Sequence, residues 1–188
     1  MRFSLTAYLL TVAAGSVLAQ PRAIDTTKSS MTVLVGKAGA FSMMGHDHEI
    51  TAPIAKGTVD AAAHTVQLEV DAAAMRVADP NVSDKDRNQI QKTMEGPEVL
   101  DSTRYPTIVF RSTAAEPGAA GAWNVRGNLT LHGSTQPVTC VVRESGGHYT
   151  GDVRFKQTGF GIKPVSAGGG TVRVKDELEI KFDIQLAQ

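Results

Sequence analysis

The sequence has a single cysteine, Cys140, no excess of charge of either sign and no apolar run long enough to span a bilayer. With one cysteine an intramolecular disulfide is excluded, so the fold must depend on its hydrophobic core. No segment reaches the ~20 apolar residues that a membrane-spanning helix needs. The 19 basic and 19 acidic side chains cancel, which gives no attraction to nucleic acid. These absences favour a soluble protein without a nucleic-acid partner.

Residues 1–19 are typical of a secretory signal peptide. Arg2 supplies the positive charge, residues 5–17 form an apolar run, and Val17-Leu18-Ala19 has the small-residue spacing of a cleavage site. We expect cleavage after Ala19, a periplasmic location and one mature domain of residues 20–188. No cysteine stands near the cleavage point to be acylated, so no stable membrane anchor is expected.

Alternation of apolar and polar residues dominates the rest of the chain and predicts half-buried strands. The pattern is clearest over residues 66–71, 123–131 and 178–186. Weaker versions occur over residues 31–35, 56–59, 107–111, 138–143, 149–155 and 171–174. Because closure protects the edges of many short strands, we expect an all-β fold, an antiparallel lipocalin-like barrel of about eight strands with one helix. A two-sheet sandwich would show the same alternation.

One segment interrupts the alternation and predicts a helix over residues 83–95. Ser83 to Asp86 form a capping box, Ile90 and Met94 share one helical face, and Gly96-Pro97 provides a stop. The apolar stripe is thin, so we expect this helix to lie across one end of the barrel or at its rim.

Three segments together resemble the YceI-like family. The most specific is Gly127 to Val138, GNLTLHGSTQPV, which is similar to the family's G-x-L-T-[IL]-H-G-x-T-x-P-V hairpin. Residues 99–112 are similar to the stretch that enters a strand ending in F-x-S, and residues 157–162 resemble R-x-D-F-G-I, with Gly159 in place of the Asp. Residues 85–90 also depart from the family's R-D-x-H-L pattern. The resemblance spans the mature chain and implies an exported barrel that binds a polyisoprenoid lipid.

The inward-facing side chains of such a barrel would form the binding site. Alternation and position indicate these candidates: Phe41, Ile108, Phe110, Trp123, Val125, Leu129, Leu131, Phe155, Phe160 and Ile162. We expect a binding or carrier protein for a long-chain isoprenoid or a related amphipathic lipid, with no cofactor, and a homodimer is compatible with this. Alternation cannot distinguish a binding site from a filled core, so a stress-associated structural barrel with a packed interior is an alternative.

A second alternative is a periplasmic metal-binding protein. His46 and His48, two residues apart on an extended segment, would point to one side and could hold a metal ion, with His132 completing the site. The competing interpretation is a polar turn in which one histidine bonds a backbone carbonyl. Catalysis finds little support, because no G-x-S-x-G motif is present and Cys140 alternates with Val138 and Val142 as a core residue. We therefore expect no enzymatic activity.

Overall fold

The computed structural model describes residues 20–38, 47–167 and 172–188. The described strands are β1 (Arg22–Ala23), β2 (Ser30–Ala38), β3 (His48–Thr51), β4 (Ile54–Asp60), β5 (Thr65–Asp71), β6 (Arg76–Val77), β7 (Thr107–Pro117), β8 (Trp123–Leu131), β9 (Ser134–Ser145), β10 (His148–Lys156), β11 (Ser166–Ala167) and β12 (Val172–Gln185). The helical elements are α1 (Asp84–Glu95) and the short 3₁₀ turns η2 (Ala72–Ala74), η3 (Ala119–Gly121) and η4 (Gln157–Phe160). Within these ranges no helix has both the length and the hydropathy to cross a membrane.

All twelve described strands belong to one antiparallel sheet with the order β1-β4-β5-β7-β8-β9-β10-β12-β2-β3-β6, and β11 pairs with β12. The sandwich interpretation is therefore wrong. The twelve described strands exceed the expected number of about eight. The expectation corresponds to the strands of seven or more residues, which are β2, β4, β5, β7, β8, β9, β10 and β12. The remaining four have only two to four residues, too few to show a period of two.

The expected strands over 171–174 and 178–186 form one strand, β12, whose register shifts between Val174 and Leu178. The shift interrupts the alternation, which explains why one strand resembles two in the sequence.

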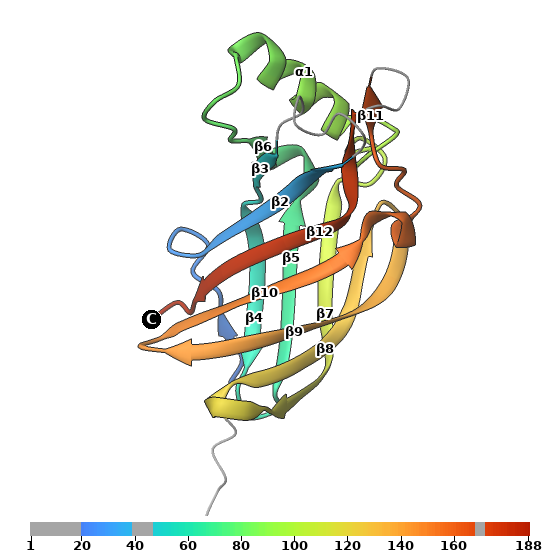
Figure 1. The fold of residues 1–188 in the computed structure, drawn as a ribbon. Coiled ribbons are helices and arrows are strands. Elements are labelled where there is room, and N and C mark those ends of the chain that lie inside the picture. The colour runs from blue at the N-terminus through green and yellow to red at the C-terminus, as the bar shows by residue number, and fades with distance from the viewer. Residues whose placement is uncertain (1–19, 39–46, 168–171) are drawn as a thin grey trace, which may run out of the picture.

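The sheet curls round an interior, as Figure 1 shows. The hydrogen-bonded ladder is not continuous round the barrel, because β1 and β6 end the described order without pairing to each other. The chain itself makes one connection between the two halves of the sheet, because only Ala52 and Pro53 separate β3 from β4. β3 pairs with β2, whereas β4 pairs with β5. Proline has no N–H to donate to a ladder, so a strand can change partners there.

The second connection runs through the segment that contains β1. This strand pairs with β4, while Ile24 forms a bridge with Leu186 just beyond β12. The Asp25 N–H donates to the Gln185 carbonyl at 2.8 Å, and the Ala187 N–H donates to the Ala23 carbonyl at 2.8 Å. These bonds join β12 to β4 and complete the wall.

Helix α1 begins and ends as predicted. Ser83 Oγ accepts a hydrogen bond from the Asp86 N–H at 3.2 Å, which is the N-cap bond of a capping box. The second bond differs from that motif, because Asp86 Oδ2 accepts from the Ser83 hydroxyl at 2.7 Å and not from the Ser83 backbone N–H. Met94 is buried in the main core cluster, and Ile90 packs against it. Figure 1 shows α1 at one end of the curled sheet, beside β3 and β6. The helix therefore covers one end of the barrel.

Candidate ligand-binding cavity

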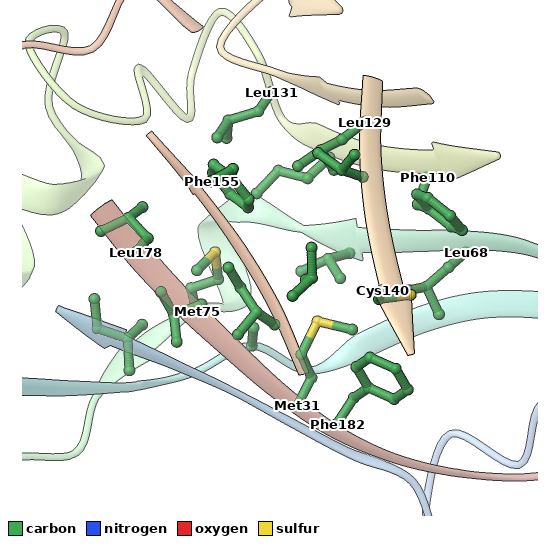
Figure 2. Close-up of a pocket in the computed structure, with 18 of the residues that line it drawn as sticks. Met31, Leu68, Met75, Phe110, Leu129, Leu131, Cys140, Phe155, Leu178 and Phe182 are labelled. Atoms are coloured by element: carbon green, nitrogen blue, oxygen red, sulfur yellow. The ribbon is translucent and has the colours of Figure 1, made fainter. Parts of the chain in front are cut away.

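The interior of the curled sheet holds a cavity of about 720 Å³. All eight long strands and α1 contribute to its lining. Figure 2 shows labelled side chains, among them Met31, Leu129 and Phe155, that come from different strands and point into one shared space. Cavities that bind small molecules usually measure about 300–1,000 Å³ and are mostly apolar. The cavity has the size and the lining of a ligand-binding site.

Eight of the ten predicted binding residues line this cavity: Ile108, Phe110, Trp123, Val125, Leu129, Leu131, Phe155 and Ile162. Phe160 does not. It is 2% exposed in the core beneath α1, where its ring meets that of Phe155 edge-on at 5.1 Å between centroids. Phe160 therefore supports a lining residue from behind. Phe41 lies outside the described residues.

Sequence reasoning missed the contribution of β2 and β12, which provide Met31, Val33, Leu178 and Phe182 among others. Alternation was visible in both segments. Alternation does not identify the neighbouring strand, however, and β2 pairs with β12 over a separation of more than a hundred residues.

Two glycines keep the cavity open by leaving room for aromatic rings against the wall. A Cβ on Gly151 would lie 2.7 Å from Phe182 Cζ and would also press on the Val141 carbonyl. A Cβ on Gly127 would meet the Phe110 ring and would lie 2.6 Å from the Arg111 carbonyl oxygen. Both distances are too short for real atoms, so these rings can occupy their positions only because the residue beneath each one has no side chain.

Cys140 also lines the cavity, as do Val138 and Val142 on the same strand, which confirms the predicted inward row. Burial raises the pKa of the Cys140 thiol to about 11, and the negative charge of Asp152 adds to the effect. The thiol is therefore protonated and unreactive at neutral pH.

Polar side chains in the lining fall into three groups. One group is at the end covered by α1: Gln89 and Thr93 on α1, His48 on β3 and Gln157 on η4. Glu144 and Tyr149 lie beside the turn between β9 and β10, and Asp60, His64 and Thr65 lie where β4 turns into β5. Figure 1 shows that turn at the end remote from α1. At that end the His64 and Trp123 rings lie 4.9 Å apart between centroids. No Lys or Arg occurs among the described lining residues.

The histidines of the metal hypothesis have other partners. His48 Nδ1 lies 2.7 Å from Asp79 Oδ2, and His132 Nδ1 lies 3.4 Å from the Phe160 carbonyl oxygen. His132 also meets the Tyr105 ring edge-on at 5.2 Å between centroids. His46 lies outside the described residues. In the part of the chain that the structure describes, no three His, Cys, Asp or Glu side chains are grouped so as to hold a metal ion.

Comparisons with known proteins agree with the geometry. A UPF0312 protein of Vibrio cholerae is 24% identical over 156 residues, which cover 77% of this chain and 78% of that protein. A UPF0312 protein of Shewanella oneidensis is 26% identical over 160 residues, 79% of this chain and 80% of that protein.

Two crystal structures share the fold. Burkholderia cenocepacia BcnA superposes with a TM-score of 0.64 and 23% identity, covering 88% of this chain and 99% of that one. The Campylobacter jejuni YCEI protein gives a TM-score of 0.50 and 8% identity, covering 98% and 94%. The family model described as the YceI-like domain matches residues 23–186, and the chain therefore belongs to the YceI-like family.

Proposed function

We propose that this protein binds a long-chain isoprenoid or a related amphipathic lipid in the cavity of the curled sheet. In this proposal it acts as a carrier, without catalysis or a cofactor, in the periplasm after removal of residues 1–19. The observation that supports it most directly is the mostly apolar cavity of about 720 Å³ to which all eight long strands contribute.

The volume sets the length of tail that the cavity can enclose. An apolar cavity of ~150 Å³ stays dry and accepts one benzene molecule, so a cavity almost five times larger holds roughly five groups of six carbons. At five carbons for each isoprene unit, these roughly thirty carbons correspond to a tail of about six isoprene units. At ~0.8 kcal/mol for each buried CH₂, such a tail would offset the entropy cost of association without any polar contact.

The alternatives fit less well. A structural barrel with a packed interior predicts no cavity, whereas about 720 Å³ of space is present. Of the three histidines of the metal alternative, His48 and His132 bond other groups, and His46 lies outside the described residues, which hold no cluster of metal ligands.

The proposal is tested by native mass spectrometry of protein isolated from its own periplasm, which should carry a bound lipid. Purified protein should also bind geranylgeraniol. Trp123, the only tryptophan, lines the cavity, so its fluorescence should report the binding. Protein that leaves the periplasm without lipid and ignores added prenyl lipids would contradict the proposal.

Two neighbouring valines on β9 provide a matched pair of variants. Val142 lines the cavity, whereas Val141 is 39% exposed on the outer face. Val142→Phe should fill part of the cavity and weaken geranylgeraniol binding at least tenfold, while Val141→Phe should leave binding unchanged. Equal affinities for the two variants would show that the lipid binds elsewhere.

A further inference from the structure

Strands β9 and β10 separate partway along the wall of the curled sheet. Their pairing begins at their common turn and stops at Cys140 and Val153, and Figure 1 shows the two strands diverging from that turn. Both strands continue beyond this point, because β9 remains paired with β8 and β10 remains paired with β12. Residues 134–139 and 154–156 therefore border a seam in the wall, across which the two strands do not pair.

Pro137 lies on the β9 side of the seam. The turn between β8 and β9 consists of His132 and Gly133, both with positive φ, as in a type I′ turn. The residues that flank such a turn, Leu131 and Ser134, exchange both of their backbone hydrogen bonds. Bonded and non-bonded pairs alternate along the ladder, so Pro137 forms a non-bonded pair with β8 and its nitrogen faces β10. Because proline has no N–H, β9 lacks the donor that a longer ladder with β10 would need.

The seam lies over the cavity. Val138 and Phe155 stand on opposite sides of it, and both line the cavity. At the start of the seam the outer surface holds a pocket of about 280 Å³, which is lined by Thr139, Cys140, Val141, Asp152 and Arg154. Cys140 also lines the cavity, so the outer pocket and the cavity meet at this residue.

The other end of the seam is closed by η4, which is fixed firmly to one side only. Thr158 donates to the carboxylate of Asp176 on β12 from its N–H at 3.0 Å and from its hydroxyl at 2.9 Å. Among the described residues, the hydrogen bond from η4 to the β8–β9 turn joins His132 Nδ1 to the Phe160 carbonyl oxygen at 3.4 Å, which is long. Widening the seam therefore breaks few hydrogen bonds.

The break in the ladder at β6 is different, because hydrogen bonds seal it. Strand β6 ends the described strand order. Gln91 of α1 accepts from the Val77 N–H at 2.8 Å and donates to the Met75 carbonyl at 2.9 Å. Its side-chain amide takes the place of a neighbouring strand, so this edge is less easily opened than the seam.

We propose that the lipid enters and leaves the cavity through the seam between β9 and β10, which opens when the Phe155 ring moves aside. Between fully paired strands an opening would have to break backbone hydrogen bonds, whereas side chains close the seam, with Phe160 packed against Phe155. Met94 of α1 belongs to the same core cluster as Phe160, so loosening of α1 also loosens the seam. The inference rests on the proposed function, since it describes how the ligand reaches the cavity.

A reversible cross-link across the seam tests the inference. In a Cys140→Ala background, Thr135→Cys and Lys156→Cys place one exposed thiol on each side, and a short bis-methanethiosulfonate reagent joins them. The linked protein should take up geranylgeraniol about tenfold more slowly than the reduced protein, because the seam can no longer widen. Stopped-flow fluorescence of Trp123 measures the rate, and the affinity at equilibrium should not change.

The paired part of the same two strands provides a matched control. Val141 and Asp152 lie directly opposite each other, so linking Val141→Cys to Asp152→Cys adds the same reagent without spanning the seam. The linked control should take up lipid as fast as its reduced form. Equal rates for the linked and reduced seam variant, or equal slowing of both linked variants, would overturn the inference while leaving lipid binding intact. Absence of binding by the reduced proteins would overturn both proposals.

The second test restores the missing donor. Pro137→Val gives β9 an N–H that faces β10, so the ladder should extend towards Lys156 and hydrogen exchange of the Lys156 amide should slow. Uptake of geranylgeraniol should slow as well, with the affinity at equilibrium unchanged. Slower amide exchange with uptake as fast as in the wild type would overturn the inference, because a closed ladder would then leave the route open.

Discussion

At the scale of single residues, the cavity changes the chemistry of the side chains that face it. The thiol of Cys140 shows this most clearly, since burial, helped by Asp152, raises its pKa from the ordinary 9.0 to about 11. In the unfolded chain the same thiol ionises at its ordinary pKa. The two states therefore bind different numbers of protons only between these two values.

This difference predicts a loss of stability in alkali. Below pH 9.0 the thiol is protonated in both states and has no effect, whereas between pH 9.0 and about 11 only the unfolded state releases the proton. The free energy of unfolding should fall in that window, by at most about 3 kcal/mol for a shift of this size. Denaturant titrations of the wild type and Cys140→Ala across this range should show the steeper fall in the wild type. Parallel curves would contradict the assignment.

Single residues also show what the sequence could and could not predict. Alternation placed Phe110 inside the barrel correctly, because it depends only on the period of a strand. It could not show that the ring lies over Gly127 on the next strand, since that contact depends on the register between β7 and β8. The His48–Asp79 pair joins residues 31 positions apart and has no local pattern at all.

At the scale of elements, the pairing of β10 with β12 opposes Gly151 to Phe182. Gly151→Ala should force the Phe182 ring towards the cavity, since the added Cβ would lie 2.7 Å from its Cζ. We expect a loss of about 1–3 kcal/mol in stability, as for other overpacked sites, together with weaker lipid binding. Thermal unfolding and geranylgeraniol titration measure the two effects. A variant as stable as the wild type with full affinity would show that the ring has other room.

Helix α1 could be predicted almost to the residue, because its start and stop signals are local. Strands β1, β3 and β6 could not be predicted, since pairing partners from elsewhere define them.

The N-cap of α1 provides a test of the helix. Ser83→Ala should remove one capping interaction and lower the free energy of unfolding by about 1 kcal/mol. Because Ile90 and Met94 of α1 line the cavity, the same change should accelerate lipid release, as measured by stopped-flow fluorescence of Trp123. Loss of stability with an unchanged release rate would show that α1 does not control the exit.

At the scale of the whole molecule, the volume of the interior limits the ligand. Affinity should rise with each isoprene unit up to roughly six units and then level off, because further carbons would remain in water. Titrations with prenols of increasing length check this expectation. A continued rise beyond that length would indicate an exit for the tail through the wall. The alternation in the sequence predicted a barrel with an interior. It could not predict that the interior contains a cavity, because the cavity depends on how the side chains of all the strands pack together.

The bridge between Ile24 and Leu186 has a consequence for how the protein matures. This bridge joins the segment that contains β1 to the residue just beyond β12, so a contact of great sequence separation must form late in folding. A partly synthesised chain has no complete wall round an interior that could hold a lipid. The proposed lipid must therefore load after the wall has formed, and a chain shortened before residue 186 would leave its apolar inner face exposed to aggregation.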